Sequence, residues 1–194
     1  NNAVGQIAGV GYTGLSTLNE ISYLSSGDDE GALYEYSASG ITGYLSVGQR
    51  NSDQSEHASR ADSNYSVGVN YAAETFSVGV GIDQTEGARQ LAASASTTIA
   101  GVSLTALAST TDLVDGDAQT AAGISASYTV GATTLTAFSL SGTAGRDANG
   151  VGASYDLGGG AALSGGLVAA NQASADVDGS KDSVLADLGV TFSF

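Results

Sequence analysis

Apolar and polar residues alternate along most of this chain, most clearly in its last twelve residues, 183–194. The apolar positions of this stretch are Val184, Ala186, Leu188, Val190, Phe192 and Phe194. The residues between them are small or polar apart from Leu185. A period of two predicts a β-strand with one apolar and one polar face. A length of about eleven residues suits a tilted strand that crosses a hydrocarbon layer better than an average soluble strand.

The same alternation predicts further strands from residue 31 onward. They are expected at 32–38, 41–50, 63–71, 75–83, 88–98, 102–111, 119–130, 133–141, 150–156 and 161–171, which makes about eleven strands with the last one. The stretch 133–141 alternates least clearly. Short Gly-rich connections take turns with longer acidic ones, as in an up-and-down membrane barrel. We therefore predict an all-β fold, a transmembrane antiparallel up-and-down β-barrel.

Residues 1–30 differ from the rest because they show no clean alternation. They are rich in Gly, Ser and Asn and end in an acidic cluster of Asp28, Asp29 and Glu30. A loop of this length in a compact domain is either functional or wrongly assigned. We divide the chain into this loop, 1–30, and a strand region, 31–194.

The polar positions of the strands are predicted to face a lumen. Glu35 shares the parity of these positions, and the further candidates for this face are Tyr44, Asn70, Asp83, Asp156 and Asp187. A charge facing lipid at mid-depth costs about 2–4 kcal/mol for Lys or Arg and less for Asp or Glu. On this assignment none of these strand carboxylates faces lipid.

Aromatic residues gather beside the short connections and the carboxy end of the chain. The predicted girdle at the periplasmic interface consists of Tyr71, Phe76, Tyr128, Tyr155 and Phe194. Tyr and other aromatic rings are favoured at that level because they are apolar at one end and polar at the other. Outward small residues, Ala161, Gly165 and Ala169, would let a neighbouring chain approach closely.

Composition excludes several classes of protein. The formal charge of -15, with five Lys plus Arg, leaves too few cations to neutralise nucleic-acid phosphates. With no Cys there is no disulfide, thiolate metal site or Cys nucleophile. The one histidine, His57, lies in a polar stretch without a GxSxG elbow, and no complete GxGxxG occurs. We expect neither an enzyme nor a nucleotide-binding protein.

Alternation alone leaves other β-proteins open. A soluble β-sandwich would turn the same Val, Tyr and Phe face inward; strand length, the absence of Pro and the terminal Phe favour the membrane interpretation. A secreted Ca²⁺-binding β-roll would need GGxGxD repeats, which are absent. A closed structural or adhesive outer-membrane barrel would fill its interior with large side chains, whereas the inward face predicted here is small and polar.

Four segments resemble a known family. GVGASYDLGGGAALSGGL at 150–167, DSVLADLGVTFSF at 182–194, VGYTGLSTLNEISYL at 10–24 and LYEYSASG at 33–40 are similar to the general porins of Rhodobacter and related alphaproteobacteria. The resemblance implies a sixteen-stranded barrel that forms homotrimers, with a third external loop folded into the lumen. It also implies that this chain is the carboxy-terminal part of a longer porin, entering at the third loop and lacking about five strands, roughly a hundred residues.

The resemblance further implies a constriction in which acidic residues of the third loop face a basic cluster on the barrel wall. The candidates carried over for the acidic side are Glu20, Asp28, Asp29, Glu30 and Glu35. The available cations, Arg50, Arg60, Arg89, Arg146 and Lys181, lie mostly near external loops, so the basic wall is expected outside this sequence. A transverse field of this kind would orient dipolar solutes and discriminate ions.

The acidic loops offer carboxylate oxygens, the ligands that Ca²⁺ prefers. Their members are Asp53, Glu56, Asp112, Asp115, Asp117, Asp176, Asp178 and Asp182. Lys181 stands where an EF-hand requires Gly, so the alternative is a solvated acidic rim, bridged by divalent ions to lipopolysaccharide. The function expected from the sequence is a passive outer-membrane channel for ions and small hydrophilic solutes, with no cofactor and a weak preference for cations.

Overall fold

The computed structural model describes Ala3 and residues 30–50, 62–85, 87–114, 116–142, 147–171 and 182–193. These residues form eleven strands: β1 (Glu30–Ala38), β2 (Ile41–Arg50), β3 (Asp62–Ala72), β4 (Phe76–Gln84), β5 (Ala88–Ile99), β6 (Val102–Leu113), β7 (Gln119–Val130), β8 (Thr133–Ser141), β9 (Asp147–Gly158), β10 (Ala161–Asn171) and β11 (Asp182–Phe192). The described residues include no helix of the length and hydrophobicity needed to cross a membrane.

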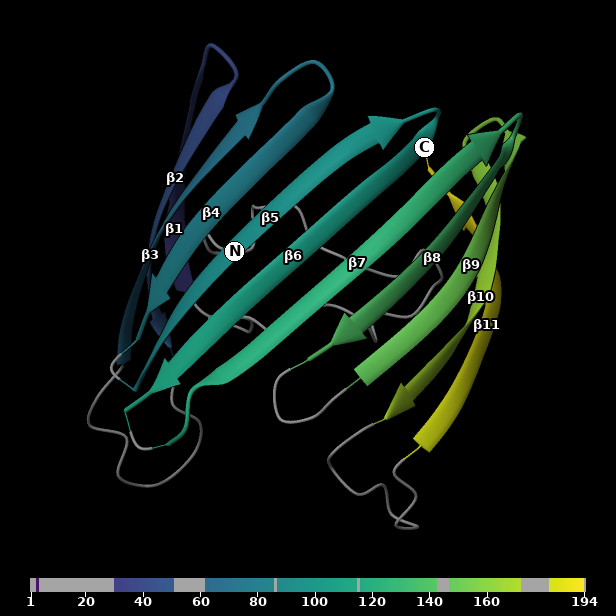
Figure 1. Cartoon of the computed structure of the whole chain (residues 1–194). Coiled ribbons are helices and arrows are strands. Elements are labelled where there is room, and N and C mark those ends of the chain that lie inside the picture. Colours follow the sequence, from purple (N-terminus) through teal and green to yellow (C-terminus); the bar gives the residue numbers. More distant parts are fainter. Residues whose placement is uncertain are drawn as a thin grey trace. The chain divides into compact units, whose positions relative to one another are not determined.

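The strands form one sheet in chain order, β1 to β11, each hydrogen-bonded to the next (Figure 1). The paired strands whose register is defined are antiparallel. This order is that of an up-and-down sheet, so the predicted fold class is confirmed. Glu30, expected at the end of the first loop, already lies in β1 opposite Gln49.

The chain divides into two compact units. Unit 1 comprises Asn1–Ala8, Ser22–Ala95 and Leu107–Thr120, and therefore holds β1 to β4 with the loop-side ends of β5 and β6. Unit 2 comprises Gly9–Ile21, Ser96–Ala106 and Ala121–Phe194, and holds the other ends of these two strands with most of β7 and all of β8 to β11. Each unit is described separately below.

Both units have two chemically different faces, as strands of period two require. In unit 1 the apolar face carries exposed residues such as Leu45, Val67, Tyr71, Val80 and Ile82. In unit 2 it carries Ile124, Leu135, Val151, Leu167 and Leu188, which are also exposed. The opposite side, called the polar face here, carries the buried residues of both units, including Ser46, Ser66, Asp83, Thr136 and Val168. Most large apolar side chains are thus exposed on one face, while the buried face carries many polar residues beside a few apolar ones, which is unlike a soluble core.

Several strands differ from the sequence prediction by one to three residues at an end, and β9 and β6 show differences that change the assignment of predicted residues. β9 begins at Asp147, three residues before the expected start at Gly150. β6 ends at Leu113, so Asp112 lies in a strand and not in the acidic loop in which it was expected. In β9 polar residues continue the strand because both neighbouring strands offer hydrogen-bonding partners: Asp147 pairs with Ser141 and with Asn171.

Candidate functional site

The polar face of unit 1 gathers the residues that were predicted to face a lumen. In the register of β1 to β4, Glu35 lies opposite Tyr44, Tyr44 opposite Gly68, and Asp83 opposite Ser66. Asn70 lies on the same face, opposite Gly79. Glu35 is exposed, Tyr44 and Asn70 are half-buried, and Asp83 is fully buried. The geometry therefore brings these four residues to one wall.

Ala3 lies against this wall. Its backbone N–H donates a 2.7 Å hydrogen bond to the Ser66 hydroxyl, which is also hydrogen-bonded to the Ser46 hydroxyl. A side chain at Gly68 would place its Cβ 2.8 Å from the carbonyl oxygen of Ala3, closer than Cβ atoms approach backbone. Ala3 itself has no exposed surface. The hydroxyl of Ser66 and the space left by the missing side chain of Gly68, both on β3, hold Ala3 in place. This arrangement is called the seat of Ala3 below.

A second polar contact in unit 1 joins β5 to β6. The Gln90 side-chain amide donates to the Thr111 hydroxyl over 3.3 Å, and both residues are buried. Burying an amide costs free energy unless it is hydrogen-bonded, so the bond holds these polar groups in place on the inner side. Sequence reasoning did not single out Gln90, although it alternates with the exposed Arg89 and Leu91.

In unit 2 the polar face is lined by hydroxyls and glycines. The Ser164 hydroxyl donates to that of Ser154 over 2.9 Å, and Asp187 lies opposite Gly166. Asp156 belongs to this face, but its carboxylate accepts the N–H of Gly158 over 2.8 Å, which caps the turn between β9 and β10. An aspartate that bonds the backbone two residues onward is a common turn element.

Part of this face in unit 2 is apolar, contrary to the expectation of a small and polar lumen side. Phe138, Leu140, Ala148 and Val168 are buried there. Phe138 lies opposite Gly150, which in turn lies opposite Val168. The Phe138 ring occupies the space that a Cβ at Gly150 would need. The unclear alternation of β8 has its origin here, because apolar residues point to both faces.

The predicted aromatic girdle occupies the apolar face beside the short turns. Tyr71 and Phe76 meet edge to face with 6.0 Å between ring centroids. After Tyr71, Tyr155 and Phe192, the next residue donates its N–H to a carbonyl of the preceding short turn: Ala72 to Gly40, Asp156 to Ala132, and Ser193 to Gly160, each over 2.8 Å. Tyr128 lies against Gly101. Phe194 is outside the described residues, and Phe192 is exposed at the end of β11.

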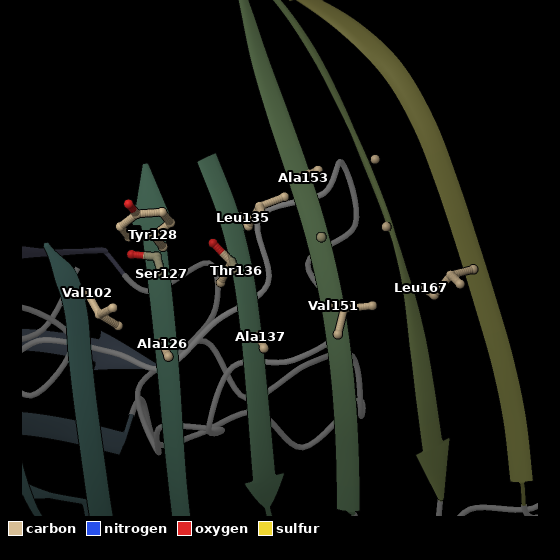
Figure 2. A pocket seen from close by; sticks show the side chains of 13 residues that line it. Val102, Ala126, Ser127, Tyr128, Leu135, Thr136, Ala137, Val151, Ala153 and Leu167 are labelled. Atoms are coloured by element: carbon tan, nitrogen blue, oxygen red, sulfur yellow. The ribbon is translucent and has the colours of Figure 1, made fainter. Parts of the chain in front are cut away.

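A groove of about 590 Å³ opens on the apolar face of unit 2 (Figure 2). Its small residues include Ala126, Ala137, Ala153 and Gly165, and its large ones are Val102, Tyr128, Leu135, Val151 and Leu167. They come from five consecutive strands, β6 to β10. Sequence reasoning did not find this groove, since it depends on which small residues stand opposite one another.

Several predicted residues lie outside the described part of the chain. These are Glu20, Asp28, Asp29 and Phe194, with the loop residues Asp53, Glu56, His57, Asp115, Asp176 and Asp178 and the cations Arg60, Arg146 and Lys181. Arg89 is exposed on β5. Within the described ranges, no group of three or more His, Cys, Asp or Glu side chains is placed to hold a metal ion.

Comparisons with known proteins agree with this geometry. A family model described as Gram-negative porin matches residues 1–193. A porin structure refined at 1.8 Å is similar with a TM-score of 0.75 and 25% sequence identity, over 98% of this chain and 73% of that one. A mutant of Rh. blastica porin is similar with a TM-score of 0.62 and 23% identity. That match covers 84% of this chain and 55% of the other, so the chain spans about half of its length. No curated protein sequence matches.

Proposed function

This chain belongs to the Gram-negative porin family of the bacterial outer membrane, and we propose from this that it forms a passive, water-filled channel for ions and small hydrophilic solutes. The observation that carries the proposal is the two-faced character of its strands. Large apolar side chains are exposed on one face, while the other carries Ser, Thr, Asn and Asp together with a smaller number of apolar residues. In a bilayer the first face meets lipid, so the second is left to line a polar interior.

A passive channel requires no catalytic group, and the proposal includes none. Solutes cross such a pore by diffusion, while hydroxyl, amide and carboxylate groups on the wall replace part of their hydration. The hydroxyls of Thr136, Ser94 and Ser109 are buried on the inner side without a protein hydrogen-bond partner among the described residues. Buried hydroxyls in proteins are usually paired with protein groups or with ordered water, so water on this face would satisfy these three.

We further propose that residues 1–30 form an inward-folded acidic loop that narrows the channel. The seat of Ala3 on Ser66 and Gly68 supports this, because it holds Ala3, a member of this segment, against the polar face. Glu35, exposed on the same face, would stand on the wall near the loop. The remaining acidic members of this proposed constriction are Glu20, Asp28, Asp29 and Glu30.

The proposed channel prefers cations weakly. The chain has 20 Asp plus Glu against five Lys plus Arg. Glu35 in unit 1 and Asp187 in unit 2 each place a carboxylate on the polar face. A wall of one sign concentrates counter-ions and repels co-ions, and salt screens the effect over a Debye length of about 8–10 Å. Because of this screening in a water-filled lumen, the preference should be small.

We also propose a homotrimer in contact with outer-membrane lipid and lipopolysaccharide. The likeness to porins supports the trimer. The acidic loop residues would bind Ca²⁺ weakly, as bridges to lipopolysaccharide phosphates. The exposed Asp112 and Asp117 are the members of these loops whose exposure the structure describes.

A second candidate is a closed structural barrel, and one observation favours it. Phe138, Leu140 and Val168 are large side chains buried on the otherwise polar face. A barrel interior filled in this way throughout would not conduct. On β2 to β4 of unit 1 the buried positions are Ser, Gly, Asn and Asp, which favours the channel.

The experiment that tests the channel is conductance of the detergent-purified protein in a planar lipid bilayer. We expect stepwise, ohmic increases in current in groups of three, and a reversal potential of cationic sign in a salt gradient. The absence of steps, with the protein shown to be inserted, would favour the closed barrel. An anionic reversal potential would contradict the proposed acidic constriction while leaving the channel itself standing.

A further inference from the structure

The groove on the apolar face of unit 2 arises from small residues that stand opposite one another in neighbouring strands. Ala126 of β7 pairs with Ala137 of β8, and Ala153 of β9 pairs with Gly165 of β10. Two large residues, Leu135 and Val151, alternate with them on the same face. The small positions therefore form a connected depression between larger side chains, as Figure 2 shows.

Glycine at 165 is required by the backbone beneath the groove. A Cβ at this position would lie 2.6 Å from the carbonyl oxygen of Asp187 and 3.0 Å from the Leu188 side chain. β10 and β11 thus approach closely here, and the absence of a side chain at Gly165 deepens the depression. The depression is a consequence of close strand packing, so it does not close by a simple side-chain rotation.

One end of the groove lies at the level of the short turns. Val102 is the first residue of β6, directly after Ala100 and Gly101, and Tyr128 packs against Gly101. The other end reaches Val151 and Leu167, near the middle of β9 and β10. In outer-membrane barrels the short turns are periplasmic. The groove therefore runs from the periplasmic interface into the hydrocarbon layer.

We propose that this groove binds one acyl chain of a phospholipid from the periplasmic leaflet. The protein lies in the outer membrane, so hydrocarbon covers this face. The volume of about 590 Å³ is within the range of roughly 300–1,000 Å³ typical of sites that hold a small molecule. Its exposed lining consists of aliphatic side chains and one tyrosine ring, which suits a hydrocarbon chain.

Dispersion, and not the hydrophobic effect, would drive this binding within the bilayer. Lipid tails are as apolar as the groove, so transfer from lipid to protein gains little by itself. A concave wall, however, contacts each methylene group on several sides, and small contact energies add up. A groove without an acyl chain would lack these contact energies. Because Tyr128 stands at the interface, its apolar ring lies beside the first methylene groups and its hydroxyl toward the headgroups.

The observations favour a phospholipid over two other occupants. The short turns of unit 2 contain no Lys or Arg, so nothing there would clamp the anionic headgroup of lipopolysaccharide. A second copy of the chain would need a surface of about 800 Å² per partner that is complementary over its whole width. The groove is instead a local depression bounded by projecting side chains such as Leu135, Val151 and Leu167, each about half exposed.

Native mass spectrometry of the purified protein, titrated with phosphatidylethanolamine, tests the proposal. The wild type should bind one phospholipid per chain in preference to the rest. Two groove-filling variants, A137F and A153L, should bind it several-fold more weakly, since the added atoms displace methylene groups from the groove and their dispersion contacts are lost. The matched control is A93L, an exposed alanine on β5 that does not line the groove.

Three results would overturn the assignment. Equal binding by all four proteins would mean that phospholipid does not occupy the groove. Displacement of phosphatidylethanolamine by purified lipopolysaccharide would reassign the site to the other lipid. Loss of the oligomer in A137F and A153L, with phospholipid binding intact, would make the groove a contact between copies. The site does not depend on the pore, so unchanged conductance in the variants leaves it standing.

Discussion

The backbone N–H of Ala3 donates a 2.7 Å hydrogen bond to the hydroxyl of Ser66, a residue 63 positions later in the chain and in the middle of β3. The acceptor is on the polar face, beside Gly68, whose missing side chain makes room for the Ala3 carbonyl. This contact ties Ala3 to the proposed channel wall. The dimensions of the channel should therefore depend on Ser66 and Gly68.

Removing the hydroxyl should loosen this attachment. A hydrogen bond of this kind contributes about 0.5–1.5 kcal/mol net, so S66A should let the attached segment leave the wall part of the time. Single-channel recordings should show a noisier open state with a shifted mean conductance. The control is S154A, which also removes a hydroxyl pair from the polar face but in unit 2. Identical single-channel traces for S66A, S154A and wild type would contradict the proposal that the Ser66 hydroxyl holds Ala3 at the channel wall.

G68A provides an independent approach to the same contact. Its new Cβ would meet the Ala3 carbonyl oxygen at 2.8 Å, so one of the two must shift. We expect a larger change in conductance than in S66A. G43A, on the apolar face with its nearest atom at 4.0 Å, should conduct as the wild type does.

Ion selectivity should respond to Glu35. A unit charge about 10 Å from a permeant ion in water interacts with about 0.4 kcal/mol, which is a factor of about two in local ion concentration. E35Q should therefore lower the cation-to-anion permeability ratio by up to roughly twofold, measured as a reversal potential at low salt. E74Q changes an exposed carboxylate between β3 and β4 and should have a smaller effect. Equal shifts in the reversal potentials of the two variants would mean that Glu35 does not line the channel.

The sequence predicted the strands well because period-two alternation is a local property. In β8 the alternation predicted the strand but did not show which of its two faces is buried. In β8, Leu135 and Ala137 point to one face and Phe138 and Leu140 to the other, so composition alone does not tell which face is inside. The pairing of Phe138 with Gly150 settles it, and that register is not visible in either strand alone.

The site was predicted only in part for the same reason. Parity placed Tyr44, Asn70 and Asp83 on one face because it requires no knowledge of the neighbouring strand. The seat of Ala3 and the groove around Ala137 depend on contacts between distant residues. Asp156 has the parity of the polar face, yet its carboxylate accepts a hydrogen bond from the Gly158 N–H and stabilises the turn. Foreseeing this from the sequence would require the turn type.

The turn between β9 and β10 should depend on Gly160 more than on Gly158. Both have a positive φ near 80°, a conformation that costs a side-chain-bearing residue about 1–2 kcal/mol. At Gly160 a Cβ would also collide with the carbonyl oxygen of Ser193, whereas nothing lies within 4 Å at Gly158. Urea unfolding in detergent should show G160A to be clearly less stable than G158A. Similar losses would mean that β11 does not pack against the turn as described.

The orientation of the two faces can be tested with charge. Val67 lies in the middle of β3 on the apolar face, and a lysine at the bilayer midplane costs about 2–4 kcal/mol. V67K should lose about that much stability when unfolded from phospholipid vesicles, whereas N70K on the polar face should lose little. A greater loss in N70K than in V67K would mean that the polar face, and not the apolar face, is the one removed from water.

Thiol modification during conductance recording tests most directly that the polar face lines a water-filled channel. The chain contains no cysteine, so single-cysteine variants have no background. Tyr44 and Leu45 are neighbours in β2 that point to opposite faces. A water-soluble, cationic methanethiosulfonate reagent should lower the conductance of Y44C in a step and leave L45C unchanged. Modification of L45C with no change in Y44C, or no response in either protein, would contradict the account.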